Sequence, residues 1–311
     1  MPGGETTNVL LLGSNSFLRP AANLSSENQL FFYSGNSFFN QGWVEAPAST
    51  DSRDGLGPLF NARSCSGCHF RDGKAEPPDN GAGPFVGLLF RISVPGPDGP
   101  LPDEVYGSQF QDQAMPGVAP EVIPYVEWIE EEGSFEDGSS FSLISPSFAF
   151  EDLGYGPLPE DLMSSPRLAP HMVGLGLLEA IPEARLRELA DPDDADGDGI
   201  SGRIQFMDHS DLPGRFGWKA ETVSVAEQVA GAFSGDMGLT TSMLEIDDCT
   251  EAQQECIDAV SGGVPEVEEQ VFDRVVLYSQ AIAVPVRRNA DSGDVLRGKT
   301  LFNELECGKC H

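Results

Sequence analysis

The stretch LFNARSCSGCH at residues 59–69 decides how this chain is interpreted, because the stretch LFNELECGKCH repeats its pattern at residues 301–311. Both have Leu-Phe-Asn, three variable residues, and then Cys-x-x-Cys-His, at an offset of 242 residues (301 minus 59). A repeat of this kind predicts two copies of one structural module. We expect residues 1–288 to form the first module with a large irregular insert, and residues 289–311 to begin the second.

Each Cys-x-x-Cys-His sequence has the spacing of a covalent attachment site for haem c. Two thiols reach the two vinyl groups of the porphyrin, and the histidine that follows coordinates the iron. The residues predicted to attach two haems are Cys65, Cys68, Cys307 and Cys310, and the predicted proximal iron ligands are His69 and His311. Two Cys-x-x-Cys pairs could instead form a zinc site, but pairs in zinc ribbons usually lie about 15–20 residues apart.

The sixth ligand of the first iron would determine its chemistry, since methionine suits electron transfer and an open position admits an oxidant. The remaining histidines and the methionines that could supply this ligand are His171, His209, Met172, Met207, Met237 and Met243. A methionine is more often a core residue than a ligand. Met237 is favoured here because it stands between Asp236 and Gly238, and glycine lets the backbone approach a porphyrin closely.

Composition and periodicity predict a mainly α-helical, loop-rich protein with minor β structure. The chain of 311 residues contains 35 Gly and 24 Pro, which predicts long irregular connections. Apolar spacing predicts helices near residues 31–39, 183–190, 266–283 and 293–306, and short strands near 122–126 and 141–144. The chain ends at its second motif, whose pocket would need downstream residues, so we expect the second module to be truncated.

Charge excludes some classes of partner. Fifty acidic residues against 18 basic residues leave a formal net charge of −32, which would repel nucleic acid. Such acidity is typical of a solvated surface, although a basic docking protein is the electrostatic expectation for any partner. No apolar run reaches the ~20 residues of a membrane span, and residues 1–7 lack the charged and apolar pattern of a signal peptide.

The cysteines nevertheless predict a periplasmic location. Haem attachment to thiols ordinarily takes place outside the cytoplasm, where disulfides also persist. The two cysteines outside the haem motifs, Cys249 and Cys256, are therefore expected to form a disulfide, with two free thiols as the alternative. A signal peptide would then have been lost from this sequence.

Several further segments, together with the two haem motifs, resemble sequences of the bacterial di-haem oxidoreductase family. Members of this family are described as peroxidases or thiol oxidoreductases. These segments are NSFFNQGW at 36–43, GLGLLEAIP at 174–182, the segment 191–203, GRFGWK at 214–219, GDMGLT at 235–240 and AVPVRR at 283–288. The resemblance implies a periplasmic protein with two c haems, a small electron-carrier protein as redox partner and a small oxidant such as peroxide. In family members a His-Asp-Met-Gly segment follows the second haem motif. By similarity to that segment, the resemblance also implies that Met237 is the distal ligand of the first haem.

A calcium site is a second prediction. In the segment 191–202, carboxylates alternate at Asp194, Asp196 and Asp198, as they do in loops that surround Ca²⁺ with oxygen. Gln205 stands where a complete loop would have a bidentate glutamate. A solvated acidic turn is the alternative interpretation.

Two residues are candidates for catalytic roles. Trp218 could relay electrons between the haems, although such a residue is more often a packing residue. Glu179 lies in an otherwise apolar segment and could move a proton of peroxide, whereas a capping or ion-paired carboxylate is the alternative.

The sequence thus predicts a haem-dependent oxidoreductase that passes electrons between its haems to a small oxidant. A pure electron-transfer cytochrome without substrate turnover is the second hypothesis. A zinc-stabilised binding module is the third, and it would require that haem be absent.

Overall fold

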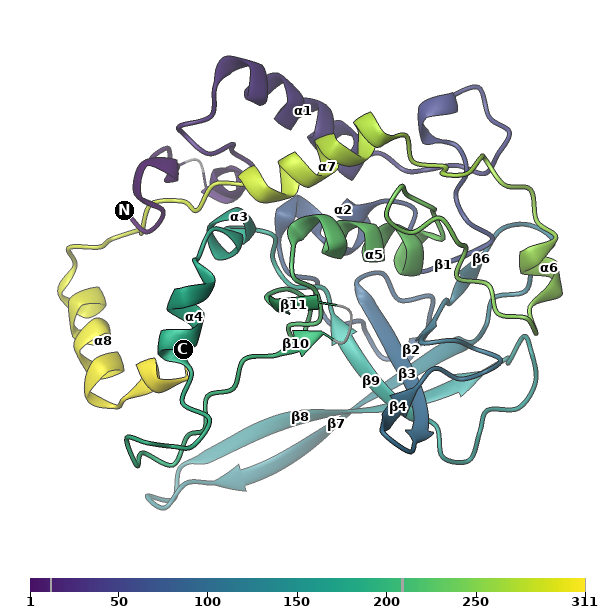
Figure 1. Cartoon of the computed structure of the whole chain (residues 1–311). Coiled ribbons are helices and arrows are strands. Elements are labelled where there is room, and N and C mark those ends of the chain that lie inside the picture. Colours follow the sequence, from purple (N-terminus) through teal and green to yellow (C-terminus); the bar gives the residue numbers. More distant parts are fainter. Residues whose placement is uncertain (12, 208–209, 311) are drawn as a thin grey trace. The chain divides into compact units, whose positions relative to one another are not determined.

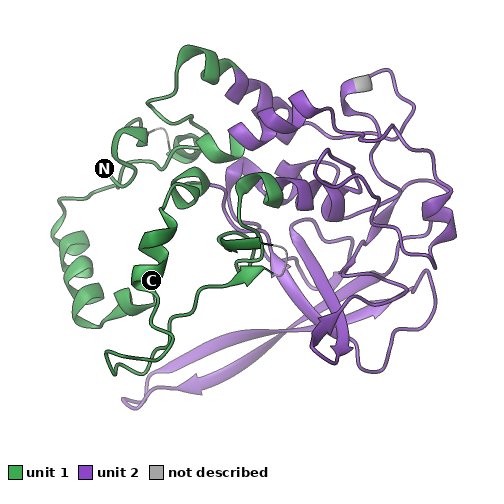
Figure 2. Ribbon diagram, in the orientation of Figure 1, with its two compact units in different colours: residues 1–30, 173–228, 278–311 green, residues 31–172, 229–277 purple. Residues whose placement is uncertain are grey.

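The structure is a computed structural model that describes residues 1–11, 13–207 and 210–310. The chain separates into two compact units, each built from segments that are far apart in the sequence (Figure 2). We call residues 31–172 and 229–277 the central unit, and residues 1–30, 173–228 and 278–311 the terminal unit. The first haem motif belongs to the central unit and the second to the terminal unit.

The helices are distributed along the whole described chain (Figure 1). The α-helices are α1 (Ser26–Asn40), α2 (Cys65–Cys68), α3 (Leu175–Glu179), α4 (Glu183–Leu189), α5 (Val225–Met237), α6 (Gln254–Ile257), α7 (Glu269–Ala281) and α8 (Gly293–Glu304). Short 3-10 helices occur at Gly4–Thr6, Gly13–Phe17, Asp51–Arg53, Phe70–Asp72 and Cys307–Lys309. The helices expected from apolar spacing correspond to α1, α4, α7 and α8.

The strands form four sheets in the described part of the chain. They are β1 (Leu59–Phe60), β2 (Gly81–Ala82), β3 (Leu88–Gly96), β4 (Gly99–Leu101), β5 (Gln109–Phe110), β6 (Gln113–Ala114), β7 (Ile123–Ser134), β8 (Ser140–Glu151), β9 (Met163–Leu168), β10 (Phe206–Met207) and β11 (Ser210–Pro213). Strand β3 pairs with β4, β5 and β9, while β7 pairs with β2 and β8, and the short pairs β1–β6 and β10–β11 complete the set.

The expectation of a mainly α-helical fold is wrong. The structure is 29% helical and 23% strand, which is a mixed α/β composition. The β structure concentrates in residues 81–168, where the sequence alternates short apolar runs with glycine and proline and predicts only short strands near 122–126 and 141–144. Antiparallel pairing across these turns forms the sheets, since short strands need partners that local periodicity cannot reveal.

An aromatic core fills the β-rich part of the central unit. Its buried members are Phe85, Leu88, Phe90, Ile92, Tyr106, Phe110, Val122 and Val126. Phe90 makes edge-to-face contacts with Phe148 and Phe150, at 5.0 Å between ring centroids in each pair. These contacts join β3 to the long hairpin β7–β8, whose pairing runs from Ile123↔Glu151 to Ser134↔Ser140.

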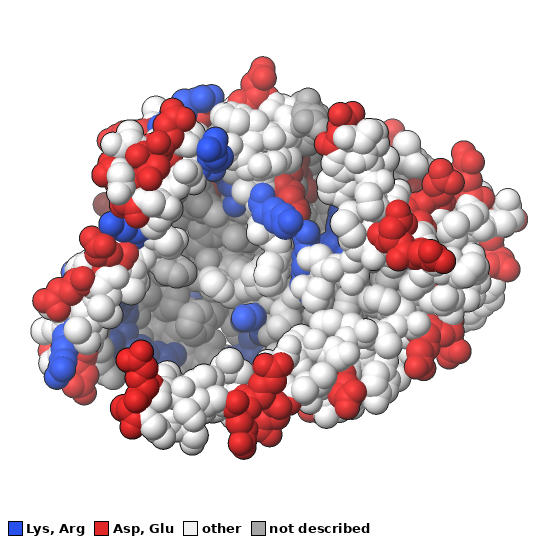
Figure 3. Space-filling view, turned by 90° about the horizontal axis from the view of Figure 1, so that it is seen from below, with Lys and Arg blue, Asp and Glu red and all other residues white. Residues whose placement is uncertain are grey.

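The described helices lack any segment that combines the length and apolar character of a membrane span. Acidic side chains are spread over the face shown in Figure 3, as the net charge of −32 requires.

Candidate functional site: the first haem motif

The two thiols of the first motif lie on the single-turn helix α2 (Cys65–Cys68). Ser64 caps this helix, since its hydroxyl accepts a hydrogen bond from the Gly67 N–H at 3.2 Å. At the other end the backbone N–H of His69 donates to the Cys65 carbonyl at 2.9 Å. Cys65 and Cys68 are half-buried and are not bonded to each other. The turn therefore presents two separate thiols followed directly by an imidazole.

The His69 ring is oriented by the backbone of a distant segment. Its Nδ1 lies 2.6 Å from the carbonyl oxygen of Pro170, which can only accept a hydrogen bond. Nδ1 therefore carries the proton, and the lone pair is on Nε2. Burial lowers the pKa of His69, which favours the neutral imidazole that binds metals. A histidine held through one nitrogen in this way is typical of a metal ligand that uses the other.

The thiols are protonated at neutral pH. Burial raises the pKa of Cys65 to about 12, and the nearby Asp236 carboxylate raises it further. Burial followed by the charge of Asp236 likewise raises the pKa of Cys68 to about 12. Because the thiolate is the form that binds metals and forms disulfides, the environment disfavours both reactions here.

The side chains around α2 are chemically compatible with a porphyrin. Phe70 and Val86 lie beside the motif and are 72% and 56% exposed, so they offer apolar surface that a bound group could cover. The Phe39 ring lies 6.3 Å from the His69 ring, centroid to centroid. The fully buried Trp43 has an indole N–H without an acceptor among the described residues, and its backbone N–H donates to the Arg63 carbonyl. A donor of this kind suits an anionic substituent such as a propionate.

Asn61, the asparagine that both copies of the repeat pattern share, is the centre of a buried polar network. Its side-chain N–H donates to the Phe110 carbonyl at 2.8 Å and to Asp112 Oδ1 at 3.2 Å. Its Oδ1 accepts from the Gln109 side chain at 2.8 Å. Its backbone N–H donates to the Asp236 carbonyl at 2.8 Å. Asn61 thus connects the haem-motif loop to both β5 and the end of α5.

Met237 ends α5 and is 2% exposed. Its carbonyl accepts from the Gly57 N–H at 3.0 Å. A side chain on Gly57 would meet the carbonyl oxygen of Gly238 at 2.3 Å, so glycine is required where these two backbones pass. The structure therefore places Met237 within the central unit, on the segment that Asn61 holds, and its role as iron ligand stays a prediction.

The second copy of the motif has a different local structure. Leu301 and Phe302 lie in α8 and are exposed, whereas their counterparts Leu59 and Phe60 are buried in strand β1. Cys307 is half-buried at the start of a 3-10 helix, and Cys310 is exposed. His311 lies outside the described residues, as does His209, one of the possible distal ligands.

A comparison with protein families identifies the group to which these features belong. The model of the family described as "di-haem oxidoreductase, putative peroxidase" matches residues 1–86 and 151–311. The chain belongs to the di-haem oxidoreductase family. No curated protein matches the chain significantly, and no solved structure does so either. Residues 87–150 of this di-haem oxidoreductase, which include β3 to β7, lie outside the matched segments.

Glu179 of the di-haem oxidoreductase holds structural hydrogen bonds in the terminal unit. Its Oε1 accepts from the N–H of Val225, the first residue of α5, at 2.7 Å, and its Oε2 accepts from the Gln280 side chain at 2.6 Å. A carboxylate in this place satisfies a donor that the helix leaves unpaired. The geometry is that of the capping alternative, and a proton-transfer role has no support from these contacts.

Trp218 lies on the surface of the terminal unit and is 58% exposed. It follows Gly217, whose φ of +81° makes the turn after the buried Phe216. Its indole therefore does not serve as core packing, and its predicted role as an electron relay stays a prediction.

The acidic loop groups a slightly different set of carboxylates from the one expected. Oxygens of Asp191, Asp194 and Asp196 lie within 4.8 Å of one another. Asp198 instead pairs with Lys309, at 3.3 Å between Oδ2 and Nζ. Several of the oxygens accept backbone N–H groups of the loop, such as Gly199 N–H to Asp194 at 3.1 Å. The predicted calcium ion stays a prediction.

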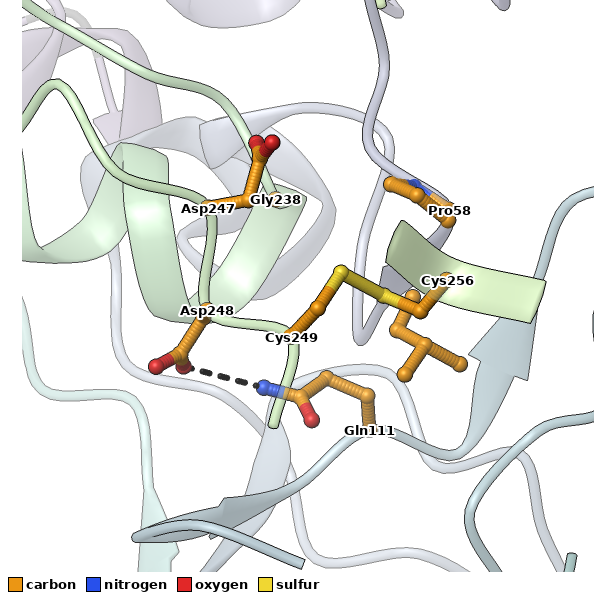
Figure 4. Close-up of a pocket in the computed structure, with 8 residues that line it drawn as sticks. Pro58, Gln111, Gly238, Asp247, Asp248, Cys249 and Cys256 are labelled. Atoms are coloured by element: carbon orange, nitrogen blue, oxygen red, sulfur yellow. Dashed lines mark hydrogen bonds between the residues drawn. A yellow bond between two sulfur atoms is a disulfide. The ribbon is translucent and has the colours of Figure 1, made fainter. Parts of the chain in front are cut away.

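Cys249 and Cys256 form a disulfide in the structure, with their Cα atoms 5.8 Å apart. The bond lies beside a cavity of about 10 Å³ that is shown in Figure 4. The cavity is lined by Pro58, Leu59, Gln111, Gly238, Asp247, Asp248, Cys249 and Cys256. It has room for about one water molecule, so it offers no space for a substrate.

Sequence reasoning missed the residues that hold the first motif in place. Gln109, Asp112 and Pro170 lie 48, 51 and 101 positions from their partners Asn61 and His69. The recurrence of asparagine in both copies was the available signal that this side chain has partners. No local pattern could have identified which residues those partners are.

Proposed function

We propose that this di-haem oxidoreductase is a periplasmic c-type cytochrome that reduces a small oxidant of the peroxide type. The observation that carries the proposal is the His69 imidazole, held through Nδ1 by the Pro170 carbonyl, directly after two unbonded thiols on one helical turn. Haem c attached to Cys65 and Cys68 would supply the redox chemistry, with His69 Nε2 as proximal ligand. Cys307, Cys310 and His311 would hold the second haem.

The chain's own residues would orient and enclose the first haem. Pro170 fixes the His69 ring, so that its ligating nitrogen keeps one direction. The apolar side chains of Phe39, Phe70 and Val86 would exclude water from one region of the porphyrin. The Trp43 indole N–H would donate to an anionic substituent.

The remaining features support a redox partner and an extracytoplasmic location. A disulfide at Cys249–Cys256 persists in an oxidising compartment, which agrees with the place where haem c is attached. Electrons would come from a small carrier protein, and the net charge of −32 favours a carrier with a basic surface.

Haem content is the first test of the proposal. Produced in a host that matures c-type cytochromes, the protein should carry two covalent haems per chain, by pyridine haemochrome absorbance and intact mass. The double variant Cys65→Ser, Cys68→Ser should carry one. The matched control Cys249→Ser, Cys256→Ser removes the same number of thiols and should keep both haems. A colourless, zinc-containing wild-type protein would overturn the proposal.

Reaction with peroxide then separates an enzyme from an electron carrier. Addition of hydrogen peroxide to the reduced protein should oxidise its haems faster than the same dose oxidises the protein after cyanide treatment, and catalytic consumption should follow when an artificial reductant is supplied. Haem bands that ignore both peroxide and cyanide would instead favour the pure electron-transfer cytochrome.

A further inference from the structure

The segment from β5 (Gln109–Phe110) to β6 (Gln113–Ala114) lies against the first haem motif, although it belongs to residues 87–150, which the family model does not match. Strand β6 pairs with β1 in the register Leu59↔Ala114 and Phe60↔Gln113. The side chains of Gln109, Asp112 and Gln113 all hydrogen-bond Asn61. Residues outside the family match therefore make direct contact with the loop that leads to Cys65.

Gln109 is the member of this set that joins two separate parts of the site. Its Nε2 lies 2.8 Å from Asn61 Oδ1, 2.9 Å from Asp236 Oδ1 and 3.0 Å from the Gly235 carbonyl. Asn61 stands four residues before Cys65, and Asp236 stands directly before Met237. One buried amide thus links the haem-motif loop to the end of α5.

The orientation of this amide is determined by a neighbour. Arg91 on β3 donates from Nη1 to the Gln109 Oε1 at 3.2 Å. A guanidinium only donates hydrogen bonds, so the amide must turn its oxygen to Arg91 and its two hydrogens to Asn61, Gly235 and Asp236. Arg91 is also part of the unmatched segment, which therefore supplies both the link and the residue that orients it.

We propose that Gln109 is a positioning residue for the first haem: it holds the loop of Cys65 and the segment of Met237 at a fixed separation, and it acts through Asn61 and Asp236. The inference rests on the proposed function, because it requires haem at Cys65 and Cys68. The second motif has no equivalent among the described residues, since Asn303, the counterpart of Asn61, is exposed on α8.

The alternative is that Gln109 merely fills buried space and contributes to stability. Gln253 offers a matched control for this alternative, because it is a buried glutamine of the same unit and its side chain also donates to an acidic side chain, that of Glu121. Among the described residues, Gln253 forms no hydrogen bond with Asn61 or with Asp236. Replacement of either glutamine by leucine removes a buried donor and should lower stability.

The experiment compares Gln109→Leu with Gln253→Leu in the background Cys307→Ser, Cys310→Ser, where the first haem is the only haem present. The readouts are the electron paramagnetic resonance spectrum of the oxidised haem and its midpoint potential. Gln109→Leu should give altered or multiple g values and a shifted potential, because the side-chain link between the two segments is lost, while backbone hydrogen bonds of Gly57 and Asn61 still join them. Gln253→Leu should match the background protein in both readouts, although its urea midpoint falls.

The outcomes separate the two proposals. If Gln109→Leu carries haem and has the same electron paramagnetic resonance spectrum and midpoint potential as the background protein, the positioning role is overturned. The proposed function then stays intact. A background protein without covalent haem would overturn both. Should Gln109→Leu fail to fold, Gln109→Glu decides by the same comparison, since glutamate keeps the volume and the acceptor for Arg91 but lacks the two donated hydrogens.

Discussion

Glu121 is a buried carboxyl group whose protonation links stability to pH. It accepts a hydrogen bond from the Gln111 backbone N–H at 2.6 Å, and burial raises its pKa from about 4.5 to about 8. Between these values the unfolded chain has released the proton and the folded chain still holds it. The free energy of unfolding therefore falls as pH rises through this range and stays low above about pH 8.

Substitution of Glu121 by glutamine should remove this dependence. Glu121→Gln cannot ionise, so its free energy of unfolding at pH 8.5 should exceed that of the wild type by about 3–5 kcal/mol. The difference should shrink to about 1 kcal/mol near pH 5, where the folded wild type is neutral at this position and the unfolded chain is close to its own pKa of about 4.5. Urea unfolding at both pH values provides the measurement. An equal difference at pH 5 and pH 8.5 would contradict the assignment of a raised pKa.

Glu179 is the residue whose expected catalytic role its contacts do not support. Glu179→Leu removes the acceptor for the Val225 N–H at the start of α5 and should lower the free energy of unfolding by about 1–2 kcal/mol. Glu183→Leu is a matched control, because Glu183 forms an exposed ion pair with Arg187 and should cost about 0.5 kcal/mol. Urea unfolding measures both. If Glu179→Leu abolished peroxide turnover at unchanged stability, the capping interpretation would be wrong.

At the scale of elements, the two copies of the repeat show that the same residues can adopt different secondary structures. Leu59 and Phe60 form a buried strand because β6 pairs with them, whereas Leu301 and Phe302 continue α8, which Ser292 caps through the Val295 N–H at 3.3 Å. The local sequence is compatible with both states, and the partner decides between them.

The same substitution in both copies should therefore have unequal effects. Asn61→Leu leaves the Gln109 amide and the Asp112 carboxylate without a partner inside the protein, which should lower the free energy of unfolding by about 2–4 kcal/mol. Asn303→Leu alters an exposed helix position and should change it by less than about 0.5 kcal/mol. Chemical unfolding of the two variants makes the comparison, and equal losses would show that the copies are structurally equivalent.

What could be predicted from sequence follows the range of the interactions involved. The helices α4, α7 and α8 were predicted within a few residues, because a repeat of apolar residues every three or four positions is local information. The haem motif was evident from five consecutive residues. The extent of the sheets could not be predicted in this way, since β3 pairs with β9 across more than 60 residues. The hydrogen bond between His69 and the Pro170 carbonyl could not be predicted either, because every residue has a backbone carbonyl.

The charge of the whole molecule has a consequence for its stability. The 18 basic residues can neutralise at most 18 of the 50 acidic residues, which leaves 32 carboxylates without a cation. The ion pairs that do form, such as Arg185 with Glu188 and Arg187 with Glu183, lie on the surface of the terminal unit. Repulsion among the remaining carboxylates opposes the compact state, and it acts through solvent, where salt screens it.

Salt should therefore stabilise the protein. Raising sodium chloride from 0.1 M to 1 M shortens the screening length from about 10 Å to about 3 Å, so the melting temperature should rise, with most of the increase below about 0.5 M. Sodium sulfate at equal ionic strength is the control, because screening depends on ionic strength whereas exclusion of sulfate from the surface does not. Thermal melts in the two salts should coincide when plotted against ionic strength at low concentration. A melting temperature that stays constant in sodium chloride would mean that the carboxylates are far enough apart for water alone to suppress their repulsion.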